Sequence, residues 1–256
     1  MNELGLCGFR EPFARLFNQG MITAGGEKMS KSKGNVVNPL DFAERYGADT
    51  VRVYTLFMGP ANEDMDWQDA GLEGVWRFLN RLWRVVHEQA AKPAEGDPGE
   101  GALARRAHRT IAKVTDDIDR RFSFHTPIAA MMELVNEIQR HPDDPAARFA
   151  AETAVSLIQP YAPHLAEELW GVLGGKRLWE RPWPEADPAL LLQDVVEVVV
   201  QVNGKVRERL HVAPGTPEEA LLELALASER VQAHVGGHVI RKTIVVPDRL
   251  VSLVVS

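Results

Sequence analysis

The sequence predicts a mainly α-helical chain that ends in a small mixed α+β module. Between about residues 68 and 174, apolar side chains recur at three- and four-residue steps, which is the period of an amphipathic helix. From residue 195 onward the pattern becomes β-rich, and a segment rich in tryptophan and proline, residues 178–184, separates the two regions. The composition is 45% apolar and 25% charged, which is typical of a globular chain and excludes a disordered one.

The first predicted segment, residues 1–66, contains short elements. Asparagine is a good helix cap and proline suits the first helical position, so Asn38-Pro39 predicts a helix start. Gly47 predicts the end of this helix in a left-handed conformation. Residues 51–57 are compatible with a strand or a short helix, because apolar runs of this length are ambiguous. Residues 1–20 predict an amphipathic lead-in, with apolar residues at helical spacing: Phe9, Phe13, Leu16 and Phe17.

The second predicted segment, residues 67–185, is a bundle of four or five antiparallel helices. The apolar stripe of its first helix includes Trp76 and Trp83, so we expect both indoles in the core rather than as platforms for stacking bases. Thr126-Pro127 predicts the start of a later helix, with the threonine hydroxyl as its cap.

The third predicted segment, residues 194–256, has a ββαββ pattern. Asn203-Gly204 between two β-rich runs is the strongest two-residue hairpin signal. Thr216-Pro217 predicts a capped helix. A module of this size is marginally stable alone. Its four strands are expected at 195–202, 206–212, 239–246 and 249–255.

Charge and composition exclude several classes of protein. The net charge of the chain is −7; residues 1–60 carry a net charge of +1, and residues 195–256 carry a net charge of 0. A polyanion must therefore be held by local clusters of basic residues rather than by overall basic charge. Apolar runs stay well short of a membrane span. The single cysteine, Cys7, excludes an internal disulfide and fits a reducing cytoplasm, where we expect the protein. His234 and His238 are separated by helix-breaking glycines, so we interpret them as a helix end and expect no protein-bound metal.

A lysine-rich loop is the segment in which reaction chemistry is visible. Its lysines alternate with two serines, and glycines lie on both sides. Lysine is a mobile point charge that follows a phosphate group, and glycine lets backbone amides approach an anion. It is not a Walker loop, because Gly-Lys-Ser/Thr is absent, and a plain solvated loop is the alternative. The residues are Lys28, Met29, Ser30, Lys31, Ser32 and Lys33.

Lys28-Met29-Ser30-Lys31-Ser32 is identical to the KMSKS signature of class I aminoacyl-tRNA synthetases. Further segments resemble the leucyl-tRNA synthetase family in order along almost the whole chain, so the chain resembles the C-terminal portion of such an enzyme. These segments include Tyr46-Gly47-Ala48-Asp49, residues 73–81, 162–170 and 202–205, and Ile240-Arg241-Lys242.

The resemblance implies that residues 1–66 end a nucleotide-binding, Rossmann-type catalytic domain. It also implies that residues 67–185 form an anticodon-binding-type bundle, and that residues 194–256 form a C-terminal tRNA-binding domain. The reaction implied is ATP-dependent formation of leucyl-adenylate, with Mg²⁺ accompanying ATP, followed by transfer of leucine to tRNA(Leu). The loop residues 28–32 would bind ATP, with Lys31 steadying the departing pyrophosphate and Lys28 as the second catalytic candidate. Met29 is expected to pack beneath the loop.

Basic residues in the other two segments are candidates for tRNA contact. Arg77, Arg81 and Arg84 share a helix face, which suits phosphate contact but is also typical of a solvated stripe. In the C-terminal segment, alternation along one strand predicts that Lys205, Arg207 and Arg209 face one side, and a solvated edge strand is the alternative. The tRNA candidates are Arg77, Arg81, Arg84, Lys205, Arg207, Arg241 and Lys242.

The sequence also departs from the family pattern. The His-x-Gly-His signature, the first half of the nucleotide fold, the leucine pocket and the editing domain are missing. We therefore expect dependence on an N-terminal portion or subunit, and exposed apolar surface such as Phe9, Phe13 and Phe57. The alternatives are a non-catalytic tRNA-binding module, or the same portion of an isoleucyl, valyl or methionyl enzyme. The ββαββ tail favours the leucyl family.

Overall fold

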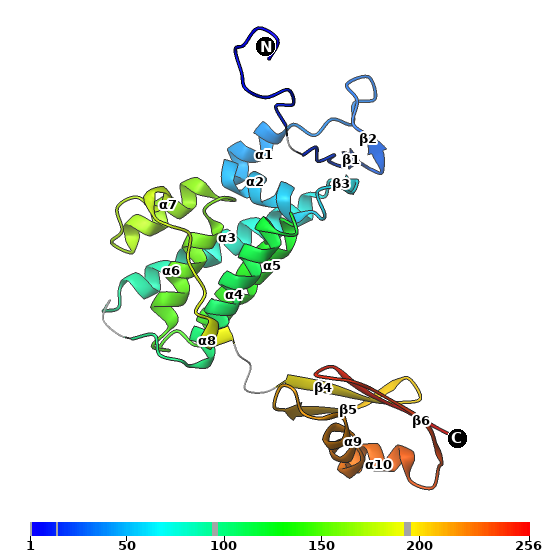
Figure 1. The fold of residues 1–256 in the computed structure, drawn as a ribbon. Helices are drawn as coiled ribbons and strands as arrows, with labels where there is room; N and C mark the ends of the chain where they lie inside the picture. The colour runs from blue at the N-terminus through cyan, green and yellow to red at the C-terminus, as the bar shows by residue number, and fades with distance from the viewer. Residues whose placement is uncertain (1, 14, 94–96, 192–195) are drawn as a thin grey trace. The chain divides into compact units, whose positions relative to one another are not determined.

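The computed structural model describes residues 2–13, 15–93, 97–191 and 196–256. The chain divides into two compact units, residues 1–190 and 191–256 (Figure 1). None of the described helices combines the length and apolar content that crossing a bilayer requires. The fold is mainly helical with two small mixed sheets, as the sequence predicts.

The first unit begins with a three-stranded sheet in the order β2-β1-β3. β1 (Ile22–Ala24) pairs antiparallel with β2 (Glu27–Lys28) and parallel with β3 (Met65–Asp66). Gly25 and Gly26 join β1 to β2 with φ angles of 64° and 74°, which glycine adopts without strain.

The predicted amphipathic lead-in does not form a helix. Its described residues form turns, bends and irregular chain, and Phe9 and Phe13 are exposed. A short helix gains most of its stability from packing an apolar face. Among the described residues of this segment, Phe17 packs on Phe122 at 4.7 Å, and none belongs to the hydrophobic core.

The next two helices follow one another directly. α1 (Pro39–Tyr46) begins as predicted, with Asn38 Oδ1 accepting the Leu40 N–H at 3.2 Å. Gly47 has a positive φ of 88°, but its ψ of 148° lies outside the left-handed helical region, and it leads straight into α2 (Ala48–Phe57). The ambiguous run 51–57 is therefore helical. Phe57 is half-buried against the core, so its predicted exposure is wrong.

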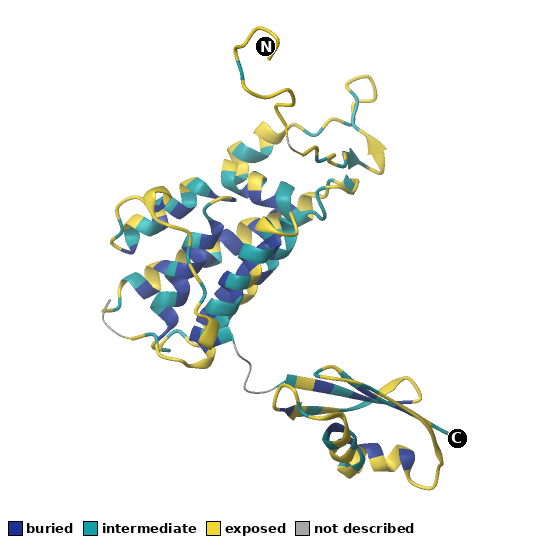
Figure 2. Ribbon diagram, in the orientation of Figure 1, coloured by how far each residue is buried: buried dark blue, intermediate teal, exposed yellow. Residues whose placement is uncertain are grey.

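Five further helices form the predicted bundle and share one core with α2 (Figure 2). A single turn of 3₁₀ helix, η1 (Leu178–Glu180), and the short α8 (Pro188–Leu191) follow them. The five helices are α3 (Asp69–Ala90), α4 (Ala102–Asp119), α5 (His125–Arg140), α6 (Ala147–Ile158) and α7 (Pro163–Val172).

Two details of the bundle differ from the prediction. Trp76 and Trp83 are 42% and 36% exposed, because α3 widens its buried stripe on the opposite flank, where Phe78 and Val85 fill the core. α5 begins at His125, and Thr126 does not cap it: the Thr126 hydroxyl instead donates to Asp117 Oδ2 at 2.7 Å.

The second unit is a four-stranded sheet in the order β5-β4-β7-β6, with β4 and β7 parallel. The predicted hairpin is confirmed, with Asn203 and Gly204 at φ angles of 49° and 77°. The predicted single helix is two helices divided at Ser228, and Thr216 does not cap because its hydroxyl donates to the Ala213 carbonyl. The elements are β4 (Val196–Val202), β5 (Lys205–Val212), α9 (Glu218–Ala227), α10 (Glu229–Val235), β6 (Ile240–Val246) and β7 (Leu250–Val255).

Candidate functional site

Asp66 on β3 braces the hairpin that carries the lysine loop. Its Oδ1 accepts the Gly26 N–H and the Thr23 hydroxyl, each at 2.8 Å. The hydrogen bond from Gly26, followed by that from Thr23, holds the pKa of Asp66 below its usual range. The carboxylate therefore fixes the turn that leads into Lys28. Sequence reasoning missed Asp66, for which a short acidic run at 63–66 was the available signal.

Asn35 closes the other end of the loop. Its Oδ1 accepts the Ser30 N–H at 2.8 Å, and its Nδ2 donates to the Lys28 carbonyl at 3.3 Å. The Ser30 and Ser32 hydroxyls lie 2.8 Å apart. The loop is thus fastened at its base while its tip is exposed to solvent.

The three lysines of the loop differ in their partners. Lys33 Nζ lies 2.7 Å from Glu27 Oε2, so its charge is already paired. Lys28 and Lys31 are exposed, and neither has a carboxylate partner within the described residues. Met29 is half-buried. Two ammonium groups are therefore available to an anion at this loop.

A second cationic site lies on the exposed face of α3. Arg77, Arg81 and Arg84 line a shallow depression of about 710 Å³ together with Gly74. None of the three arginines has an ion-pair partner in the described parts of the chain, and Arg81 Nε is buried without a hydrogen bond. The predicted arginine stripe therefore has the free charge that a phosphate contact needs.

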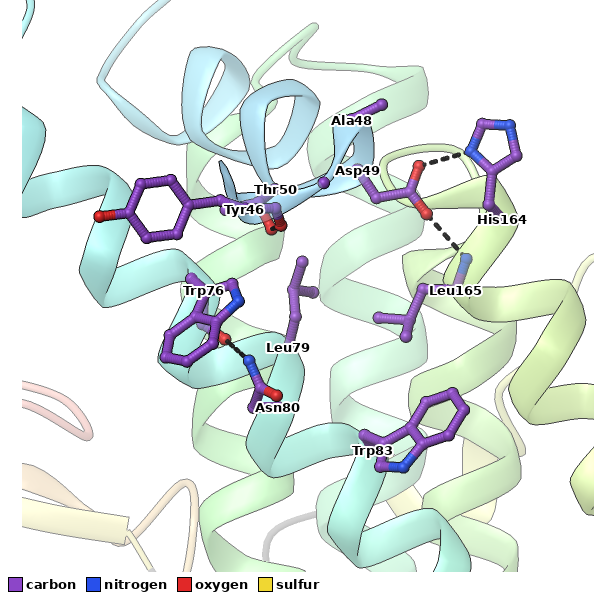
Figure 3. A pocket seen from close by; sticks show the side chains of 11 residues that line it. Tyr46, Ala48, Asp49, Thr50, Trp76, Leu79, Asn80, Trp83, His164 and Leu165 are labelled. Carbon is purple, nitrogen blue, oxygen red and sulfur yellow. Dashed lines mark hydrogen bonds and ion pairs between the residues drawn. The ribbon is translucent and has the colours of Figure 1, made fainter. Parts of the chain in front are cut away.

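A pocket of about 490 Å³ adjoins this depression, between the α1–α2 junction, α3 and the start of α7 (Figure 3). Asp49 joins two of its walls: its Oδ1 lies 2.9 Å from His164 Nδ1, and its Oδ2 accepts the Leu165 N–H at 2.7 Å. Trp76 and Trp83 stand on the α3 wall, so the two indoles predicted for the core line both hollows.

The basic residues of β5 do not share one face. A register shift lies between the pairs Val200–Glu208 and Gln201–Val206, so Arg207 is an extra residue opposite β4. Lys205 is paired with the buried Val202, on the face that the helices cover, whereas Arg209 is on the opposite face. The predicted alternation is wrong because the bulge reverses it.

The remaining basic candidates lie on the edge strand β6. Arg241 sits at a second register shift, and its Nε donates to Ser256 Oγ at 2.7 Å. Lys242 is paired with Val254 and is exposed. Within the described ranges, no three His, Cys, Asp or Glu side chains are grouped so as to hold a metal ion.

Comparison with protein families defines the class of protein. Residues 4–68 match the family model "tRNA synthetases class I (I, L, M and V)", and residues 101–222 match "Anticodon-binding domain of tRNA ligase". The signature loop and the helical bundle are therefore parts of a class I aminoacyl-tRNA synthetase.

Individual relatives specify the family. The leucine–tRNA ligases of Geobacter sp. (strain M21) and Citrifermentans bemidjiense are 45% and 46% identical over 273 residues, covering 100% of this chain and 33% of each relative. The Agrobacterium radiobacter K84 agnB2 LeuRS–tRNA–LeuAMS ternary complex has a TM-score of 0.77 and 31% identity, covering 100% of this chain and 35% of that one. The chain spans about a third of the length of the relatives it matches. These matches identify it as a C-terminal portion of the leucyl-tRNA synthetase family, and the predicted resemblance is confirmed.

Proposed function

We propose that this chain supplies the ATP loop and the tRNA-holding surfaces for ATP-dependent leucylation of tRNA(Leu). The observation that carries the proposal is the braced KMSKS loop, in which Lys28 and Lys31 have no carboxylate partner in the described ranges while Lys33 is paired. Positive charge stabilises a reaction most where negative charge develops in the transition state.

In the first step, the leucine carboxylate attacks the α-phosphorus of ATP, which enters with Mg²⁺ as its substrate complex. The bond between the α-phosphorus and the bridging oxygen breaks, and pyrophosphate leaves with the electron pair. Lys31 neutralises the charge that accumulates on pyrophosphate, and Lys28 assists from the base of the loop. Asp66 and Asn35 support this role because they fix the two ends of the loop.

In the second step, the leucyl group moves from the adenylate to the terminal adenosine of tRNA(Leu), and AMP leaves. Arg77, Arg81 and Arg84 hold phosphates of the tRNA body, which positions the tRNA without reading its sequence. In the second unit, the candidate contacts are Lys205, Arg207, Arg241 and Lys242. The solved relative in complex with tRNA supports this partner.

The reaction needs a leucine pocket, which we assign to the N-terminal portion of the enzyme. The exposed apolar side chains of Phe9, Phe13 and Leu16 suit contact with such a protein partner. We place the reaction in the cytoplasm, in keeping with the single cysteine.

The test is to combine the chain with the N-terminal two thirds of a leucyl-tRNA synthetase and measure leucine-dependent exchange of pyrophosphate into ATP. We expect exchange and tRNA leucylation only when both parts are present. Tight tRNA binding without restored exchange would support the non-catalytic tRNA-binding module instead. Absence of both tRNA binding and exchange would refute both functions.

A further inference from the structure

We propose that the pocket beside α3 binds an unpaired base of the tRNA, stacked on Trp76 and Trp83. This inference rests on the proposed tRNA-binding function and adds a base-binding subsite to it. The α3 arginines hold phosphates, and the pocket receives the base of a nucleotide that is not paired.

The two indoles are exposed and held in place before any ligand arrives. They lie seven residues apart on α3, which is two turns, or about 10.5 Å along the axis. The Tyr46 ring packs edge-on against Trp76 at 6.1 Å, and the His87 ring lies 4.4 Å from Trp83. Aromatic side chains fixed in this way are suitable platforms for stacking bases, because every base has a π-face.

The pocket between the indoles has the size and lining of a site for a small planar ligand. Its volume of about 490 Å³ lies within the range of ligand pockets, and Leu79, which is buried, lies between the indoles (Figure 3). Asn80 Nδ2 donates to the Trp76 carbonyl at 2.8 Å, which leaves Asn80 Oδ1 to accept from a base amino group. The His164 ring is largely exposed at the rim, and because Nδ1 faces Asp49, Nε2 remains for the ligand.

The adjoining charge favours a nucleotide over a peptide or a neutral ligand. Trp76, Asn80 and Trp83 line both the pocket and the arginine depression, so a base in one lies next to cations in the other. Gly74, which also lines the depression, would have no heavy atom within 4 Å of an added Cβ, so no contact within the described chain requires glycine there. Glycine inside a helix lowers stability, but it allows another backbone to approach closely. Paired bases do not offer their faces, so the ligand is an unpaired nucleotide.

The experiment measures binding of the full 256-residue chain to a tRNA(Leu) transcript and to a short, fully paired RNA duplex, over a series of salt concentrations. We expect Trp83→Leu and Trp76→Leu each to weaken tRNA binding by roughly 5- to 150-fold, with an unchanged salt slope. Duplex binding should stay at the wild-type level. Trp179→Leu is the matched control, because Trp179 is exposed on η1 and outside the pocket.

Further variants separate this inference from the function on which it rests. Trp83→Tyr keeps an aromatic platform and should recover most of the affinity for tRNA that Trp83→Leu loses. The two variants should unfold at the same temperature, so that the difference in affinity reflects stacking and not stability. Wild-type affinity of both leucine variants for tRNA would overturn the base subsite, as would an equal loss for tRNA and duplex. If the wild-type chain itself binds no tRNA, the proposed tRNA-holding function fails, and the subsite fails with it.

Discussion

Substitution of Lys31 by alanine tests the role of the ATP loop most directly. Lys31 is exposed and has no carboxylate partner among the residues that the structure describes, so removing its ammonium group breaks no ion pair among them. The stability of the chain should be unchanged, and any loss of rate should come from the reaction. Removal of one preorganised donor from a developing negative charge lowers rates by about 10²–10³, or roughly 2.7–4 kcal/mol. We expect a loss of this size in adenylate formation.

Lys33→Ala is the matched control, because it removes an identical charge from the same loop. Lys33 and Glu27 form an ion pair in which the two side chains are 57% and 61% exposed. An exposed pair of this kind contributes at most about 1 kcal/mol, which limits its effect through the loop to about fivefold. The two alanine variants should therefore differ by at least an order of magnitude.

The assay is leucine-dependent pyrophosphate exchange in the assembled enzyme at saturating leucine, with ATP varied. Thermal unfolding of each chain shows whether the fold is retained. If Lys31→Ala exchanges pyrophosphate at the wild-type rate, Lys31 does not act on the leaving group. If both variants lose the same large factor, the loop acts as a whole and the distinction drawn from the Glu27 pair is wrong.

Three further changes test other parts of the molecule. Gly74→Ala should raise the free energy of unfolding by up to about 1 kcal/mol, measured by a melting curve, and yet weaken tRNA binding, measured by a binding titration. An unchanged affinity for tRNA would contradict close approach of the RNA backbone at Gly74. Asp66→Ala should slow pyrophosphate exchange and leave tRNA affinity unchanged, so equal exchange rates would remove its bracing role. Burial would raise the pKa of Asp117, but the hydrogen bonds from Lys113 and Thr126 outweigh it and hold that pKa below its usual value. The stabilisation is therefore present above a pH of about 3.9 and is lost as the pH falls through the lower folded pKa. Asp117→Asn should cost about 1–3 kcal/mol near neutrality and progressively less in acid, and a constant difference across the pH series would refute the assignment.

Local signals in the sequence predicted most elements because their physical causes are local. Asn38-Pro39 and Asn203-Gly204 fix backbone geometry through their own side chains or φ angles, and both behave as predicted. Thr126 and Thr216 carry equally good capping signals, but their hydroxyls donate elsewhere. Asp117 lies nine residues before Thr126, and Ala213 lies three residues before Thr216, so both bonds depend on how the chain turns before each helix, which the Thr-Pro pair alone does not specify.

The tryptophans of α3 show a second limit of the sequence. A helical stripe of apolar residues that repeats every seven positions does not show which of its two flanks is buried. On α3, Trp76 and Trp83 lie on one flank, and Phe78 and Val85 lie on the other. Which flank is buried depends on where the neighbouring helices pack. The exposure of these indoles, beside arginines without ion-pair partners in the described part of the chain, therefore depends on how the bundle packs. The apolar periodicity of α3 alone could not predict that these two indoles are exposed.

The KMSKS loop and the α3 surface are also connected through the residues that lead into α3. Asp66, which braces the ATP loop, lies three residues before the start of α3, the helix that carries the arginines and both indoles. Trp67 between them packs against Tyr54 at 4.9 Å and donates from Nε1 to Asp69 Oδ1 at 2.9 Å. Tyr54 in turn donates to the Gln68 carbonyl at 2.8 Å. Asp66 and α3 are therefore joined by a short, well-packed connection, which ties the carboxylate that braces the KMSKS loop to the helix that carries the arginines.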